Sequence, residues 1–103
     1  MTFSTGEPFK LDASGVVKAQ LRELLRKAKK KGVLPPMIEA FQRIENRLRT
    51  GPHDAGEPLY TLGPPRIAMR IIADSPLVVE YGVMEEQRVV LVRSFRSMVD
   101  LDS

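Results

Sequence analysis

The sequence predicts an α+β fold, in which a two-helix hairpin packs on one face of a twisted, mainly antiparallel sheet of about four strands. Apolar residues recur at helical spacing within residues 14–51 and alternate at strand spacing within residues 58–95. The two helical stretches are separated by only a few residues, which favours an antiparallel hairpin. We expect one domain over residues 1–103, with flexible tails at 1–8 and 98–103.

The composition excludes several kinds of site. A chain of 103 residues can bury a core without metals or disulfides. It has no cysteine, which removes structural disulfides, thiol nucleophiles and thiolate metal sites. No residue cluster has metal-ligand spacing, so we expect no metal and no cofactor. No early apolar run follows a charged start, and no stretch approaches the roughly 18 apolar residues that span a bilayer. We therefore expect a soluble, cytoplasmic protein without a signal peptide or membrane contact.

Both helices have recognisable ends. Ser14 is a good N-cap for the first, and Gly32 is a natural end because glycine tolerates positive φ. Pro35 and Pro36 open the second, where a missing N–H costs nothing, and Gly51 ends it. Each helix carries one apolar stripe, formed by Val17, Leu21, Leu24, Leu25 and Ala28 in the first and by Met37, Phe41, Ile44 and Leu48 in the second.

Strand patterns fill the rest of the chain. Two long strands are predicted at residues 66–73 and 77–84, and a further one at about 89–95. Residues 59–65 form a short strand with a turn, and residues 9–13 alternate and could form a short first strand. The expected order is therefore two helices and four strands, preceded by a further strand if residues 9–13 pair with the sheet.

The hydrophobic pattern also selects the register of the first long hairpin, because a one-residue slip exchanges the two faces of a strand. A three-residue loop at 74–76 sets Met69 opposite Tyr81 and joins the apolar faces. The same loop sets Arg70 opposite Glu80 on the other face. A four-residue loop would bury Arg70 among core residues, which is costly.

The next turn, "EEQR" at 85–88, lacks the glycine or asparagine of a tight type I′ turn. A four-residue loop there sets Glu80 opposite Arg93 and Tyr81 opposite Val92. A two-residue loop would shift the partners and keep the faces, whereas a three-residue loop would bring Arg93 into the core. We therefore expect Glu80 to lie between two arginines on the open face of the sheet.

The predicted row is Arg70, Glu80 and Arg93, with Arg66 nearby on the same face. Such a row is an ordinary cross-strand charge ladder, worth roughly 0.2–1 kcal/mol per opposite pair, or it is a working surface. In the second case the arginines bind phosphates in bidentate fashion and stabilise charge on a scissile phosphate. Glu80 would then orient an arginine or act as a base.

The net charge of +3 is unevenly distributed. Residues 18–31 hold seven basic residues and one acidic residue, whereas the rest of the chain holds nine basic and twelve acidic residues. This basic segment favours a polyanion or an acidic partner, although a helix can also be lysine-rich for solubility alone. The candidate nucleic-acid contacts are Lys27, Lys29, Lys30 and Lys31, together with Arg66. His53 is alone in a loop, and we interpret it as a turn residue.

The chain resembles the RelE/ParE toxin superfamily, the small toxins of bacterial toxin–antitoxin pairs. The helix hairpin ends near "GEPLYTL" (56–62), which is similar to a Gly-x-Pro-Leu-x-x-Leu signature. "AMRII" follows, with Arg70 at a frequent arginine position. "VVEYGVMEEQRVVLVRSF" (78–95) resembles the Val-x-Tyr-x-Val-acidic-acidic run and the closing strand. The resemblance covers residues 17–97, and the ordered combination of loose motifs carries it.

The resemblance implies a concave working face and an antitoxin protein that neutralises it. Members similar to RelE cut messenger RNA on the ribosome without a metal, which would make this chain a metal-independent endoribonuclease. The matching candidates for catalysis are Arg70, Glu80, Arg93 and Arg96.

Two stretches depart from the nuclease members. They usually have arginine just before the valine of Val-x-Tyr, where this chain has Val78. The closing strand also has Phe95-Arg96-Ser97 in place of a Gly-His-Arg or Gly-Lys-Arg end. A non-catalytic binding module that keeps the fold and binds a protein partner is therefore the alternative. A gyrase-directed toxin similar to ParE is a further one.

Overall fold

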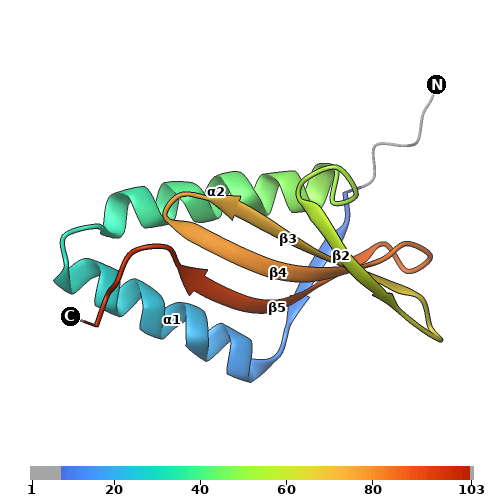
Figure 1. The fold of residues 1–103 in the computed structure, drawn as a ribbon, viewed down its shortest axis with the longest axis horizontal. Helices are drawn as coiled ribbons and strands as arrows, with labels where there is room; N and C mark the ends of the chain where they lie inside the picture. The colour runs from blue at the N-terminus through green and yellow to red at the C-terminus, as the bar shows by residue number, and fades with distance from the viewer. Residues whose placement is uncertain (1–7, 103) are drawn as a thin grey trace.

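The computed structural model describes residues 8–102, in which two helices precede the long strands of a single sheet (Figure 1). The elements in chain order are β1 (Lys10–Ala13), α1 (Gly15–Lys30), α2 (Leu34–Thr50), β2 (Glu57–Leu62), β3 (Ile67–Asp74), β4 (Leu77–Met84) and β5 (Val89–Ser97). The strand order is β1-β5-β4-β3-β2, with β1 parallel to β5 and the other pairs antiparallel. The predicted α+β class is confirmed, with five strands where about four were expected.

The helices begin and end where the sequence indicates. The Ser14 hydroxyl oxygen accepts a hydrogen bond from the Val17 N–H at 3.2 Å, which caps α1. Gly32 adopts a φ of 76°, which allows the chain to reverse between the helices. Pro35 and Pro36 lie in the first turn of α2. None of the helices in residues 8–102 has the length and apolar character that crossing a membrane requires.

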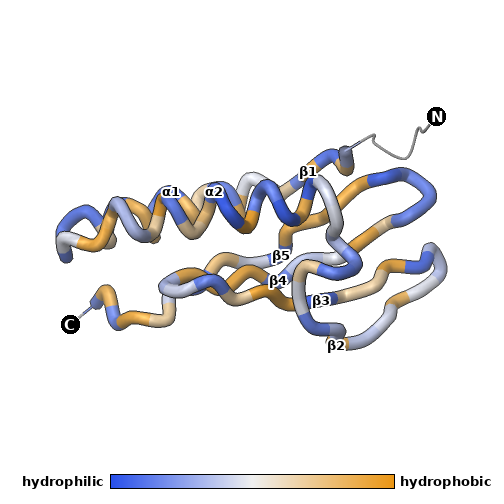
Figure 2. The backbone as a smooth tube through the Cα atoms, turned by 90° about the horizontal axis from the view of Figure 1, so that it is seen from above, coloured by the Kyte–Doolittle hydropathy of each residue, from blue (hydrophilic) through white to orange (hydrophobic). Residues whose placement is uncertain are grey.

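The core lies between the two helices and one face of the sheet (Figure 2). From α2 it receives four side chains that are at most 2% exposed, those of Met37, Ala40, Ile44 and Leu48. From β4 it receives alternate residues, namely Leu77, Val79, Tyr81 and Val83. Neither helix covers the opposite face of the sheet (Figure 2).

The predicted pairing of β3 with β4 is wrong by one residue. Asp74 pairs with Leu77, so the turn between these strands has two residues instead of three. Arg70 consequently lies opposite Tyr81 and not opposite Glu80. Because side chains alternate along a strand, this slip exchanges the faces of β3.

The slip decides what each face of the sheet carries. Ile72, opposite Val79, belongs to the core, while Met69 lies opposite Gly82 on the uncovered face. Met69 is nevertheless 2% exposed, because the absence of a side chain at Gly82 leaves room for it. The prediction of a shared apolar face for Met69 and Tyr81 is therefore wrong.

The turn between β4 and β5 has the four residues that were expected, and Tyr81 lies opposite Val92 as predicted. A β-bulge follows at this point. Glu80 pairs with Ser94, and Arg93 has no directly opposite partner. The predicted pairing of Glu80 with Arg93 is therefore wrong.

The bulge has a cause in the sequence. Val92 and Phe95 are three residues apart, yet both side chains are buried in the core, 8% and 7% exposed. Regular alternation puts only residues at even spacing on one face. One extra residue between them restores the pattern, and Arg93 takes that place on the exposed side of the chain.

Candidate functional site

Arg70 lies on the helix-covered face and is bound to the loop that leaves α2. Its Nη2 donates a hydrogen bond to the Gly56 carbonyl oxygen. Opposite it, the Tyr81 hydroxyl donates to the Pro52 carbonyl oxygen at 2.8 Å. Burial raises the pKa of Tyr81, and the neighbouring Arg70 guanidinium partly opposes this shift. Arg70 therefore supports the loop from inside and is separated from the other predicted catalytic residues.

Glu80 and Arg96 share the uncovered face. Glu80 is opposite Ser94 and Arg96 is opposite Val78, which makes the two charged residues diagonal neighbours on adjacent strands. Neither forms an ion pair with another residue of the described range 8–102. Arg93, in the bulge between Val92 and Ser94, is exposed and borders a cavity near the start of α1. Of the four predicted catalytic residues, the structure thus brings together Glu80 of β4 and Arg96 of β5. Arg93 lies on β5, three residues before Arg96.

The predicted nucleic-acid contacts do not form one surface. Arg66 is exposed in the turn between β2 and β3, whereas the lysines lie where α1 ends, at the other end of the molecule's long axis (Figure 1). Lys29, Lys30 and Lys31 are exposed, but the Lys27 ammonium is 2.6 Å from a carboxylate oxygen of Asp102. The hydrogen bond to that carboxylate raises the pKa of Lys27.

The uncovered face of the sheet, called the open face below, is largely apolar. Strand pairing places on it nine large apolar residues, Tyr60, Leu62, Ile67, Met69, Ile71, Val78, Met84, Val89 and Leu91, together with the charged residues Lys10, Asp12, Glu57, Glu80 and Arg96. Tyr60 is 53% exposed and Leu62 40%, while most of the others are half-buried. An antiparallel sheet that turns one face to water normally carries polar residues there. A group of apolar side chains on such a face is a candidate contact site.

Sequence reasoning missed the open face because it used the wrong register. With the predicted register, the arginine at position 70 fell on this face and the isoleucine at 71 fell in the core. The signal that could have exposed the error is that both faces of β3 carry apolar residues, three on one face (Ile67, Met69 and Ile71) and two on the other (Ala68 and Ile72).

A second feature that the sequence did not indicate is the contact between His53 and Glu85. His53 lies in the turn after α2, and its Nε2 bonds the carboxylate of Glu85 after β4. The His53 ring also meets the Phe9 ring edge-on, and the Arg88 guanidinium lies 4.1 Å from the Phe9 centroid. These contacts join the loop after α2 to the β4–β5 turn, beside a cavity of about 570 Å³ that Arg66 also lines.

Residues 8–102 contain no group of three or more side chains arranged to hold a metal ion. A comparison of the chain with protein-family models, with curated proteins and with solved structures finds no match. The fold and the geometry of the surface are therefore the basis for any functional proposal: two helices on one face of a mixed five-stranded sheet, and an open face that is mainly apolar.

Proposed function

We propose that this protein is a non-catalytic binding module whose partner is another protein that lays an apolar, carboxylate-bearing segment on the open face. The observation that carries the proposal is the row of apolar side chains on the side of the sheet away from the helices. An antitoxin-like protein is the partner that the resemblance to the RelE/ParE toxins favours.

The driving force would be burial of apolar surface. Removing apolar area from water is worth about 25 cal/mol per Å², and the complete burial of one side chain such as Ile71 or Leu91 about 1.5–3 kcal/mol. Both are half-buried in the isolated chain, so a partner would gain only the remainder. Several such contacts together are needed to exceed the entropy cost of association.

Charged residues on the open face and next to it specify the partner further. Arg96 and Arg93 lie on β5, and neither is paired with a carboxylate of residues 8–102. A partner carboxylate placed on Arg96 would gain a charge-assisted hydrogen bond and fix the register of the complex. Glu80 accompanies Arg96 on this face, so a partner with one basic residue beside its acidic one would match both.

The test introduces a photo-crosslinking amino acid at Ile71 or Leu91 in cells of the source organism, with Val16 on α1 as a control position. Val16 is 81% exposed and belongs to the other side of the molecule. We expect one protein to crosslink from both open-face positions and not from Val16. Purified, that protein should bind the unaltered chain, and Ile71→Lys should weaken binding by about tenfold, which is 1.4 kcal/mol. Equal binding by the Ile71→Lys and Val16→Lys variants would contradict the proposal.

A second candidate is the metal-independent endoribonuclease that acts on messenger RNA at the ribosome. The observation that favours it is the proximity of Glu80 to Arg96 on one face, where a carboxylate could act as a base beside a phosphate-binding guanidinium. The lysines at the end of α1 would then contact ribosomal RNA in a salt-dependent manner.

Expression of the chain in bacteria separates the two functions. A nuclease should arrest growth and produce new cleavage ends in messenger RNA. Both effects should disappear in the Arg96→Ala and Glu80→Gln variants and persist in an Arg22→Ala control. Normal growth with intact messages, at the same level of folded protein, would leave the binding module as the remaining function.

A further inference from the structure

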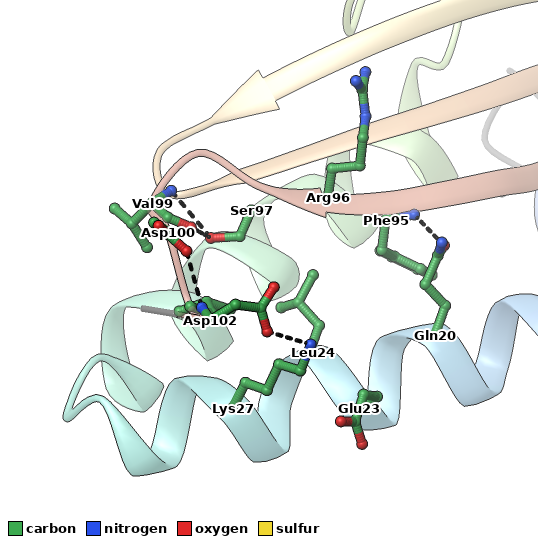
Figure 3. Close-up of a pocket in the computed structure, with 11 residues that line it drawn as sticks. Gln20, Glu23, Leu24, Lys27, Phe95, Arg96, Ser97, Val99, Asp100 and Asp102 are labelled. Carbon is green, nitrogen blue, oxygen red and sulfur yellow. Dashed lines mark hydrogen bonds and ion pairs between the residues drawn. The ribbon is translucent and has the colours of Figure 1, made fainter.

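A groove runs between α1 and β5 on the helix side of the sheet. Residues 98–102, which follow β5, turn back toward α1 and border this groove (Figure 3). A cavity of about 470 Å³ stays open beside them. From α1 and β5 it is lined by Gln20, Glu23, Leu24, Lys27, Phe95 and Arg96, and Glu23 is paired with Arg26. The groove is thus partly filled by the chain itself.

Residues 98–102 are held by an apolar anchor and a charge. Leu101 packs against the hydrophobic core, and the Asp102 carboxylate is 2.6 Å from the Lys27 ammonium. The Asp102 N–H donates to a carboxylate oxygen of Asp100 at 2.9 Å, and the Met98 N–H donates to the Pro76 carbonyl oxygen at 2.7 Å. The pattern is one apolar residue between two carboxylates, seated beside a basic helix.

The edge of β5 that borders this groove has no neighbouring strand from the described residues over part of its length. β1 pairs only with Val89–Val92, so the edge beyond Val92 has no described strand beside it. The Phe95 N–H donates there to the Gln20 side-chain oxygen at 2.7 Å. A side chain thus takes the place that a backbone carbonyl would occupy in a longer sheet, while Arg96 points away from α1 (Figure 3).

We propose that this groove is a second interaction surface, which receives an acidic peptide segment of another protein, and that residues 98–102 occupy it as an internal competitor. The partner segment would place an apolar side chain where Leu101 packs and a carboxylate on Lys27. Residues 27–31 add four lysines and only one uncharged residue to that end of α1, which complements an acidic segment.

Two features favour a peptide over a nucleic acid. The groove combines a cation with an apolar seat, and a phosphate backbone can use only the cation. An extended peptide can also take the place of the Gln20 side chain at the Phe95 N–H, because strand addition uses backbone hydrogen bonds at a sheet edge. The proposal does not rest on the function assigned to the open face, because Gln20, Leu24 and Lys27 lie on the helix side of the sheet.

Because residues 98–102 already occupy the groove, the test needs a variant in which this segment no longer binds there. A tethered segment has an effective concentration of the order of millimolar, so a peptide added at micromolar concentration competes poorly with it. The probe is a fluorescent peptide that carries Val-Asp-Leu-Asp, the sequence of residues 99–102, and its binding is followed by fluorescence anisotropy. The proteins are full-length chains with and without Leu101→Ser and Asp102→Asn.

We expect the doubly substituted chain to bind the probe at least about tenfold more tightly than the unaltered chain. Adding Lys27→Gln should weaken that binding about fivefold or more, since it removes the charge partner. Lys18→Gln, a lysine of α1 outside the groove, is the matched control and should change nothing. Peptides with Val-Asn-Leu-Asn or Val-Asp-Ser-Asp should each bind more weakly than the probe.

Two results would overturn the proposal: no saturable binding of the probe to the released chain, or binding that Lys27→Gln leaves unchanged. A single-stranded RNA that binds the released chain more tightly than the probe would also overturn it and assign the surface to nucleic acid. If far-UV circular dichroism shows that the doubly substituted chain is unfolded, Asp102→Asn alone keeps Leu101 in place. That variant should bind the probe more tightly than the unaltered chain, and equal binding by the two would contradict the proposal.

Discussion

Arg70 lies directly opposite Tyr81 on neighbouring strands, and both side chains hold the same loop. Arg70 donates to the Gly56 carbonyl oxygen and Tyr81 to the Pro52 carbonyl oxygen, so the chain between α2 and β2 is fastened to the sheet at two points. A residue that looks like a surface arginine in the sequence is therefore part of the internal support of this loop.

Replacing Arg70 tests that role. Arg70→Met should lower the free energy of unfolding by about 1–3 kcal/mol, because it removes a charged donor and leaves the Gly56 carbonyl without its partner. Urea denaturation measures the change. Arg66→Ala, in the exposed turn between β2 and β3, is the control and should stay within about 0.5 kcal/mol of the unaltered chain. A stable Arg70→Met variant that lost an RNA-cleaving activity would instead place Arg70 in a catalytic site.

The phenol of Tyr81 should make stability depend on alkaline pH. Burial raises its pKa above the ordinary value of 10.0. An acid whose pKa is raised in the folded state stabilises that state below the unfolded pKa, and the contribution is lost as pH rises through the folded pKa. Tyr81→Phe should remove this part of the pH dependence and cost about 1 kcal/mol at neutral pH through the lost hydrogen bond to Pro52.

The measurement for Tyr81 is urea denaturation of both proteins at several pH values between neutral pH and strong alkali. The difference in unfolding free energy between the unaltered chain and Tyr81→Phe should shrink as pH rises. A difference that stays constant over that range would show that the hydroxyl does not titrate differently in the two states.

Two glycines should respond differently to alanine. A Cβ at Gly56 would be 2.2 Å from the Ile71 carbonyl oxygen, which belongs to the backbone of a paired strand. A Cβ at Gly82 would be 2.9 Å from the Met69 sulfur and 2.6 Å from a methyl carbon of Ile67, both of which are side-chain atoms. Overpacking typically costs about 1–3 kcal/mol, and we expect Gly56→Ala to cost more than Gly82→Ala.

Thermal and urea denaturation compare the two alanine variants. Met69→Ala combined with Gly82→Ala should recover part of the loss of the single Gly82 variant, since it removes one of the clashing groups. Equal destabilisation at Gly56 and Gly82 would mean that the sheet adapts to both insertions equally well.

Asp74 should contribute an acid-sensitive tie between α2 and the β3–β4 turn. Two hydrogen bonds of 2.8 Å from Arg43 hold the pKa of Asp74 below its ordinary value. An acid with a lowered pKa stabilises the folded state above its unfolded pKa, near 3.8, and the contribution is lost as pH falls through the folded value. Asp74→Asn should therefore be less stable than the unaltered chain at neutral pH and equally stable in strong acid.

Urea denaturation of both proteins between about pH 2 and pH 7 would show their free energies of unfolding converge as the pH falls. Glu86→Gln in the exposed β4–β5 turn is a suitable control. A difference between Asp74→Asn and the unaltered chain that persisted in strong acid would assign the effect to something other than the carboxylate charge.

Local signals predicted much of the fold. The cap at Ser14, the reversal at Gly32 and the prolines of α2 each act within a few residues, so the helix boundaries could be predicted from neighbouring residues alone. The absence of glycine and asparagine from residues 85–88 argued against a tight type I′ turn, and four residues do join β4 to β5. The grouping of elements into helices first and strands afterwards then gave the α+β class.

The candidate site was less predictable, since it depends on the register of strands and on contacts between distant residues. The register argument assumed that an arginine cannot lie on the core face. Arg70 does so because a carbonyl of a loop 14 residues earlier accepts its hydrogen bond. The pairing of His53 with Glu85, and of Lys27 with Asp102, likewise joins residues that no local pattern connects.

The sequence by itself thus determined the two capped helices, the strand periodicity and the basic end of α1, because local propensity and spacing decide these features. Only the tertiary structure decided which face of the sheet each residue of β3 occupies. Along that strand both faces are apolar, so burial alone does not select a register, and a hydrogen bond from Arg70 to Gly56 is compatible with one register and not with the next. That choice gave the open face its apolar side chains from β3, next to Glu80 of β4 and Arg96 of β5.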